Sequence, residues 1–292
     1  MKQRTIQKPV EVVGIGLHKG VPVKLRLEPL AENSGIVFYR SDKGISIPLK
    51  PENVVDTKMA TVIGKDGVVI STIEHLMSAV YAFGIDNLRI MVDNDEVPIL
   101  DGSAISFVMM IKEAGIKELE APKRFLRITK EVEIKDGNKF AKISPSKNIS
   151  FDFEIFFDHP MIGDQKYHFN FSTKNYIEEI ARARTFGFLK EVQYLRSIGL
   201  ALGGSLENAI VLDDKGILNE NLRFPDEFVR HKILDAIGDM SLLGANFIGE
   251  YQAFASGHHL NHLLTLKVFE EEAYEIISVS SKEELAIAKV FS

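Results

Sequence analysis

Residues 21–28 read Val21-Pro22-Val23-Lys24-Leu25-Arg26-Leu27-Glu28, an alternation of apolar and charged side chains. A period of two is typical of a β-strand that buries one face. The segment before it, Gly14-Ile15-Gly16-Leu17-His18-Lys19-Gly20, superficially resembles a dinucleotide-binding glycine loop. Such a loop needs a following helix whose N-terminus holds the pyrophosphate, whereas here a strand follows. We therefore expect a turn between two strands rather than the start of a doubly wound sheet.

Strand and helix patterns alternate irregularly along the rest of the chain. Further strands are predicted at residues 36–39, 87–92, 125–128 and 150–157. Helices are predicted at residues 72–83, 104–119, 175–183, 188–197, 225–243 and 259–271. Both halves of the chain mix the two types without a regular strand–helix–strand order, which favours an α+β fold with mostly antiparallel early strands.

The length of 292 residues is about twice the usual size of a domain, so two domains are expected. The boundary is predicted in Glu120-Ala121-Pro122-Lys123-Arg124, where a helical pattern ends at a proline and a strand pattern begins. We accordingly divide the chain into a first α+β domain, residues 1–121, and a second, residues 122–292.

Composition excludes several classes of protein. The 35 Lys and Arg against 41 Asp and Glu give a net charge of −6, so no general basic field is available to bind nucleic acid. The chain contains no cysteine, which rules out disulfides, a thiolate nucleophile and a cysteine-ligated zinc site. We find no signal peptide and no apolar run long enough for a transmembrane segment, and we expect a cytoplasmic, monomeric protein.

One predicted helix places an imidazole beside two carboxylates. His231, Asp235 and Asp239 recur every four residues, on a different stripe from the apolar positions. Side chains four apart lie one helical turn from each other, so His231 and Asp235 could share a metal ion. The alternative is an ordinary ion pair on a solvated helix face.

A second helix carries His75 near its start, in Ser71-Thr72-Ile73-Glu74-His75-Leu76 and off the apolar stripe. Glu74 has two interpretations. It could be the reciprocal partner of Ser71 in a capping box, or it could be a general base beside a metal-binding His75.

The third candidate is the turn Ser256-Gly257-His258-His259-Leu260-Asn261-His262. Glycine allows the backbone to bend closely, so His258 is a candidate loop-borne acid. We interpret His259 and His262 as helix-face residues that are exposed to water.

Taken together, these segments resemble the zinc-dependent UDP-3-O-acyl-N-acetylglucosamine deacetylases of Gram-negative lipid A biosynthesis. The family motifs appear in order as Ile73-Glu74-His75-Leu76, as His231 through Asp239 and as Gly257-His258-His259-Leu260-Asn261. The segments Gly14 to Gly20, Asp101-Gly102-Ser103-Ala104 and Ala183-Arg184-Thr185-Phe186-Gly187 also match. Each motif is weak alone, whereas their ordered combination is highly specific.

The resemblance implies a fold and a metal site. The fold would be two related α+β domains, each a mostly antiparallel sheet with helices on one face, so that the helices are sandwiched between two outer sheets. His75, His231 and Asp235 would be the ligands of one catalytic Zn²⁺, with Fe²⁺ as the alternative metal. The ion would lie in the cleft between the domains, with a fourth position open for water.

The resemblance also implies an activity: hydrolysis of the 2-acetamido group of UDP-3-O-[(R)-3-hydroxyacyl]-N-acetylglucosamine to acetate and UDP-3-O-acyl-glucosamine, the committed step of lipid A biosynthesis. Glu74 would activate a zinc-bound water, and Thr185 would help to hold the oxyanion. His258, oriented by Asp239, would protonate the amine leaving group.

The substrate of such an enzyme requires two further kinds of contact. Lys232 matches the family's lysine for the diphosphate, although it could also be a solvated helix lysine. Phe157 is the best match for a uracil contact, and Phe186 lies in a matching motif. We hypothesise that Leu189, Val192 and Ala201 face the acyl chain, although an apolar helix face of this kind is normally part of a core.

Two other functions agree less well with the sequence than this deacetylase. A peptidase is disfavoured because the helix carries His-x-x-x-Asp and lacks His-Glu-x-x-His. A binding protein without turnover would be expected to lack a ligand, the base or the acid, and no motif position is lost.

Overall fold

The computed structural model describes residues 1–278 and 286–291. Its first half is built on a five-stranded sheet in the order β2-β3-β9-β4-β5, antiparallel except where β4 runs parallel to β9. The strands are β2 (Val10–Ile15), β3 (Pro22–Pro29), β4 (Ile36–Arg40), β5 (Ile45–Pro48) and β9 (Leu88–Val92). In β3 the apolar side chains of the alternating pattern, Val23, Leu25 and Leu27, are almost completely buried. The predicted turn connects β2 to β3.

The second half is built on a seven-stranded sheet around β18 (Asn246–Phe254), which pairs with β11, β13 and β14. The other strands are β11 (Arg124–Ile128), β12 (Val132–Asp136), β13 (Lys139–Ser144), β14 (Ile149–Phe157), β15 (Gly163–Asn170) and β19 (Tyr274–Ser278). Most pairs are antiparallel, and β18 is parallel to β11 and β14.

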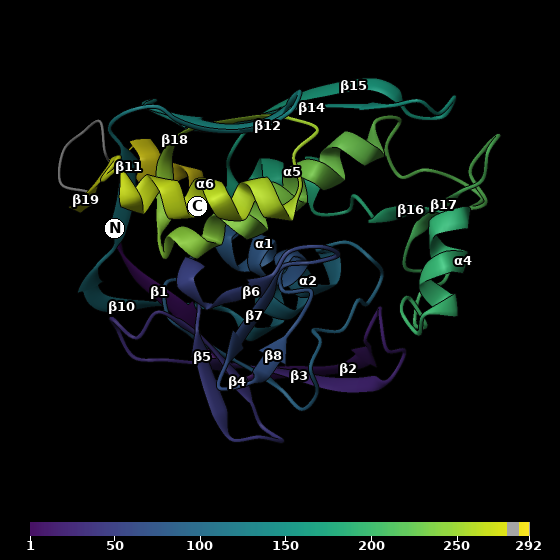
Figure 1. The fold of residues 1–292 in the computed structure, drawn as a ribbon. Helices are drawn as coiled ribbons and strands as arrows, with labels where there is room; N and C mark the ends of the chain where they lie inside the picture. Colours follow the sequence, from purple (N-terminus) through teal and green to yellow (C-terminus); the bar gives the residue numbers. More distant parts are fainter. Residues whose placement is uncertain (279–285, 292) are drawn as a thin grey trace.

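Four helices lie between the two sheets (Figure 1). They are α1 (Glu74–Ala82), α2 (Ile105–Ala114), α5 (Glu227–Met240) and α6 (His258–Glu270). This layer order confirms the expected α+β fold with helices sandwiched between two sheets. In the part of the chain that the structure describes, no helix is both long and apolar enough to cross a bilayer.

Each half also carries a small appendage. The first is a three-stranded sheet of β6 (Val54–Asp56), β7 (Val62–Lys65) and β8 (Val68–Ile70). The second consists of α4 (Leu189–Ser197) with the parallel strands β16 (Phe186–Phe188) and β17 (Ile210–Leu212), and it projects from one end of the molecule (Figure 1).

The remaining elements are short. A two-stranded ribbon joins β1 (Lys2–Ile6) to β10 (Ile116–Pro122). The helical turns are η1 (Pro51–Asn53), α3 (Thr173–Asn175), η2 (Tyr176–Ile180), η3 (Ser241–Leu243) and η4 (Lys289–Phe291). The chain passes from the first half to the second at Lys123, whose buried ammonium donates to Asp86 and to the carbonyl oxygen of Gly84. The division at residues 121 and 122 stays a prediction.

Two predicted helices differ from those observed. The helix predicted over residues 104–119 ends at Ala114, because Gly115 adopts a positive φ of 72° and the chain continues as β10. The helix predicted over 175–183 is replaced by α3 and the π-helical turn η2, which together end at Ile180. In both segments the apolar residues recur at helical spacing, but the backbone hydrogen bonds are not those of one continuous α-helix.

Candidate metal centre and active site

Gly238 allows α1 and α5 to approach each other closely. A Cβ atom at this position would lie 2.0 Å from the backbone oxygen of Glu74, which is a forbidden distance. The missing side chain therefore lets the first turn of α1 rest against the last turn of α5. This contact brings His75 on α1 beside His231 and Asp235 on α5.

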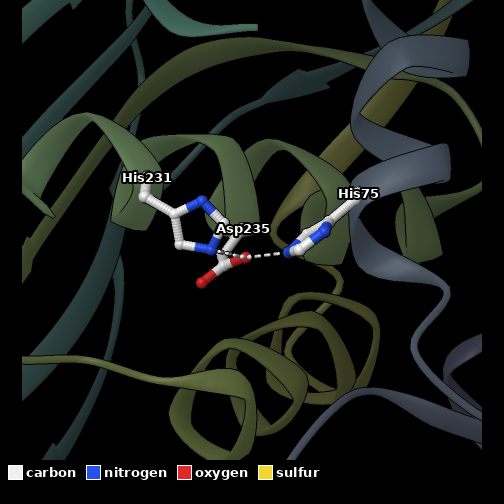
Figure 2. A group of neighbouring side chains, drawn as sticks. All are labelled: His75, His231 and Asp235. Atoms are coloured by element: carbon white, nitrogen blue, oxygen red, sulfur yellow. Dashed lines mark ion pairs between the residues drawn. The ribbon is translucent and has the colours of Figure 1, made fainter. Parts of the chain in front are cut away.

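The side chains of His75, His231 and Asp235 point toward one another (Figure 2). Asp235 Oδ1 lies 3.4 Å from His75 Nε2 and 3.3 Å from His231 Nε2. Each residue offers one ligand atom, and these atoms lie within 4.8 Å of one another. All three residues are at most 5% exposed, so the solvated ion pair considered from sequence is wrong.

The polar environment prepares these atoms to accept a cation. His231 Nδ1 donates to the carbonyl oxygen of Ala183 at 3.0 Å, which leaves the Nε2 lone pair free. Burial lowers the pKa of His231 to about 4, so the ring is neutral at pH 7. Asp235 Oδ1 is buried and has no hydrogen-bond donor among residues 1–278 and 286–291. Two imidazole nitrogens and an unsatisfied carboxylate oxygen fit a divalent cation.

Asp235 remains ionised despite its position. Burial opposes its charge, but His231 and Lys232 together hold the pKa of the carboxyl well below its usual range. Lys232 Nζ lies 3.2 Å from Asp235 Oδ2, the oxygen that faces away from the two imidazoles. The carboxylate therefore keeps one oxygen for a metal and uses the other for the lysine.

A second cluster of titratable side chains joins Glu74, His258 and Asp239. His258 Nδ1 donates to Asp239 Oδ2 at 2.9 Å, and its Nε2 lies 3.7 Å from Glu74 Oε1. Burial disfavours the imidazolium of His258, but the Asp239 and Glu74 carboxylates outweigh it and raise the pKa to about 10. Burial also raises the pKa of Glu74. The arrangement pairs a carboxylate that can take a proton with an imidazolium that can give one.

Neighbouring polar groups fix this cluster in place. Thr61 donates from its backbone N–H to Glu74 Oε2 at 3.1 Å and from its hydroxyl to Asp239 Oδ1 at 2.6 Å. Asn261 Nδ2 donates to Asp239 Oδ2 at 2.8 Å, and Asn261 Oδ1 accepts from the hydroxyls of Tyr251 and Ser256. Sequence reasoning missed Thr61 because only the folded chain brings the loop before β7 to α5.

Two sequence interpretations at this cluster are wrong. Glu74 is not the partner of Ser71 in a capping box, since α1 has no side-chain cap and Glu74 Oε2 accepts from Thr61. His258 is not in a loop but is the first residue of α6, after Gly257. Of the two neighbouring histidines, His259 is exposed as expected, whereas His262 is half-buried and contacts the carbonyl oxygen of Pro51.

A cavity of about 630 Å³ opens over these groups. Its wall includes every predicted contact for the polar part of the substrate, namely Phe157, Thr185, Phe186 and Lys232, beside His231, Asp235 and His258. Lys58 and Lys139, which no sequence motif singled out, also line it, together with the acidic Asp136 and Glu191. Phe186 packs edge-on against Phe157 with ring centroids 5.8 Å apart.

An apolar cavity of about 440 Å³ continues from the first one beneath α4. Thr185, Phe186 and Gly187 line both, so the two cavities adjoin. The three side chains hypothesised to face an acyl chain, Leu189, Val192 and Ala201, all line the apolar cavity. This side of α4 therefore faces a hollow and not a filled core.

A second group of side chains has metal-like spacing. Asp152, His168 and Glu250 lie on adjacent strands of the seven-stranded sheet. Unlike the first group it is partly exposed, and Lys166 lies 3.8 Å from Asp152. We do not assign a reaction to it.

Comparisons with known proteins find relatives along nearly the whole chain. The family model described as UDP-3-O-acyl N-acetylglycosamine deacetylase matches residues 3–270. A protein of Nautilia profundicola named UDP-3-O-acyl-N-acetylglucosamine deacetylase is 81% identical over 292 residues, which is 100% of both chains. Proteins with the same name are 70% identical in a Nitratiruptor species, over 96% of this chain and 95% of that one, and 59% identical in Campylobacter jejuni, over 100% of both.

Proposed function

This chain belongs to the family of UDP-3-O-acyl-N-acetylglucosamine deacetylases, and we propose from that premise that it is a metal-dependent amidohydrolase. Its reaction is hydrolysis of the 2-acetamido group of UDP-3-O-[(R)-3-hydroxyacyl]-N-acetylglucosamine. The products are acetate and UDP-3-O-acyl-glucosamine, on the route to lipid A. A nucleotide-linked substrate suits a cytoplasmic location, and we propose that the enzyme works there as a monomer.

The observation that carries the proposal is the buried group of His75, His231 and Asp235. These side chains would hold one Zn²⁺, and the same nitrogen and oxygen donors are also suited to Fe²⁺. When bound, the ion supplies positive charge that acidifies a water molecule and polarises the acetamido carbonyl. Hydrogen bonding of His231 to Ala183 and of Asp235 to Lys232 orients two of the three ligands before the metal arrives.

Glu74 is the general base in this proposal. Its Oε2 is fixed by the N–H of Thr61, which leaves Oε1 as the atom that takes a proton from the attacking water. The water oxygen then forms a bond to the acetamido carbonyl carbon. Thr185, in the wall of the same cavity, donates its hydroxyl to the oxygen on which negative charge develops.

His258 is the general acid. Its Nδ1 is engaged by Asp239, so its Nε2 carries the proton that goes to the amine nitrogen as the carbon–nitrogen bond breaks. Its pKa of about 10 keeps the ring charged. A nearby dication would lower that pKa toward the working pH, because like charges repel.

The rest of the substrate is held along the two cavities. Lys232 provides a cation for the diphosphate that the net charge of −6 does not supply, and Phe157 with Phe186 offers aromatic surface to the nucleotide and sugar. The acyl chain extends into the apolar cavity along Leu189, Val192 and Ala201.

The proposal is tested by mass-spectrometric detection of deacetylation of the acylated UDP-sugar by the purified chain. We expect turnover that is lost in Glu74→Gln and His258→Ala and kept in His259→Ala, whose exposed side chain hydrogen-bonds to Thr57 at the cavity mouth. Turnover that survives both of the first two substitutions would refute the assigned roles. No turnover by a metal-replete wild-type chain would refute the activity itself.

A further inference from the structure

Six large side chains form an exposed apolar surface at one end of the molecule. They are Val13, Ile15, Val21, Tyr194, Ile198 and Leu202, and each is between 38% and 66% exposed. We call this surface the end patch. Its first three members come from β2 and the residue just before β3, and the others from α4 and the loop after it. Figure 1 shows both segments at the same end of the molecule.

The two parts of the end patch are joined rigidly. Leu202 and Gly203 donate their backbone N–H groups to the carbonyl oxygens of His18 and Leu17, both at 3.0 Å. A Cβ atom at Gly203 would lie 2.2 Å from the backbone oxygen of Gly16, so only glycine permits this approach. Segments about 180 positions apart in sequence are therefore held against each other.

The end patch continues into the apolar cavity. Leu17, Ala201 and Leu206 line the cavity and belong to the same two segments as the patch. Leu206 is also 47% exposed, so it connects the cavity wall to the outer surface. The cavity and the end patch are therefore built from the same two segments of the chain.

The charge of these segments differs from that of the whole chain. Residues 13–21 and 194–206 contain no Asp or Glu, although the chain has 41 such residues and a net charge of −6. Their cations are Lys19 and Arg196. Lys19 forms an ion pair with Asp95, whereas Arg196 donates to the backbone oxygens of Ala201 and Gly204. In the described part of the chain Arg196 has no carboxylate partner, so these apolar segments carry one unneutralised cation, which complements an anionic lipid surface.

From these observations we propose that the end patch rests on an anionic lipid bilayer while the acyl chain of the substrate occupies the adjoining cavity. The inference rests on the proposed function, because it is the acylated substrate that gives the cavity its occupant. Tyr194 has the amphipathic ring typical of side chains at a membrane interface. Such docking is reversible, since the patch is small and no spanning segment is involved.

Vesicle flotation of the full-length chain tests this docking. The probe is a vesicle of phosphatidylethanolamine and phosphatidylglycerol, with phosphatidylcholine vesicles as the neutral comparison. We expect the wild type to float with the anionic vesicles, and the double variant Ile198→Glu/Leu202→Glu to lose roughly tenfold or more of that binding. Met109→Glu is the matched control, because Met109 is 59% exposed on α2 and lies outside the patch. It should float like the wild type.

Three outcomes would overturn the inference: a wild type that stays with the soluble fraction, a double variant that floats like Met109→Glu, or a wild-type dimer that the double variant disperses. The last result would identify a second copy of the chain as the partner. Deacetylation is measured in parallel without vesicles. If the wild type turns over substrate but does not float, only this inference fails, whereas loss of turnover would be a failure of the proposed function.

Discussion

Helices α5 and α4 both border the cavities, but they differ in how they are packed. Twelve of the 14 residues of α5 are buried, whereas none of the nine residues of α4 is. On α5 the surroundings fix each functional side chain before any ligand arrives. On α4 the apolar side chains face a hollow. The comparison suggests that α5 sets the geometry of the reaction, and that α4 completes its packing only when an acyl chain fills the cavity.

The largest effect is expected at the chemical groups that α5 and α1 hold. Glu74→Gln removes the proposed base but keeps the shape of the side chain, so we expect kcat to fall by about 10²–10⁴-fold. Metal content should be unchanged, because Glu74 is not among the three grouped ligands. Steady-state kinetics and elemental analysis of the same preparation check both points. A normal kcat in Glu74→Gln would show that Glu74 is not the general base.

Asp239→Asn tests the positioning of His258, with an expected loss of about 10²-fold in kcat. The Asp239 carboxylate helps to raise the pKa of His258, so its removal lowers that pKa. An acid with a lower pKa loses its proton at lower pH, and the alkaline limb of the kcat profile should therefore move to lower pH. Thr61→Val removes only the 2.6 Å hydrogen bond to Asp239 and keeps the carboxylate, so it should not move the alkaline limb to lower pH. An unmoved alkaline limb in Asp239→Asn would show that Asp239 does not act through His258.

Gly238→Ala tests the contact between α1 and α5. Its Cβ would meet the backbone oxygen of Glu74 at 2.0 Å, so the helices must separate. We expect a loss of about 1–3 kcal/mol in the free energy of unfolding and a fall in activity of roughly tenfold to 10²-fold from the displaced Glu74. Gly216→Ala is the control, because a Cβ there has no neighbour within 4 Å. Thermal unfolding and kcat are measured for both variants. Equal stability and equal kcat in Gly238→Ala and Gly216→Ala would contradict the close contact.

The smallest overall effect is expected on α4. Val192→Trp fills part of the apolar cavity, so it should shift the preference toward shorter acyl chains by roughly tenfold in kcat/KM. Turnover of the shortest substrate should stay near the wild-type value. Gln193→Trp, on the neighbouring position that does not line this cavity, should leave the preference unchanged. An unchanged preference in Val192→Trp would mean that α4 does not contact the chain.

The sequence predicted the helices and strands more completely than the packing between them. Apolar spacing located α5 and its polar stripe, but it could not reveal that α1 covers that stripe, so His231 and Asp235 could equally be solvated. Gly238 belongs to the motif, yet its meaning is visible only where Glu74 touches it. Thr61 carries no local signal, because its two hydrogen bonds depend on the position of the loop before β7. Sequence periodicity describes one element, whereas the site depends on contacts among several.

The central claim is that α1 and α5 jointly form one metal site on which turnover depends. It is tested most directly by measuring bound metal and deacetylation together in the wild type, in His75→Ala and in Asp235→Ala, after chelation and after zinc is restored. We predict about one ion per wild-type chain, activity that returns in proportion to bound metal, and little metal or activity in either variant. Full turnover by the chelated wild type, or normal metal content with normal turnover in either variant, would contradict the account.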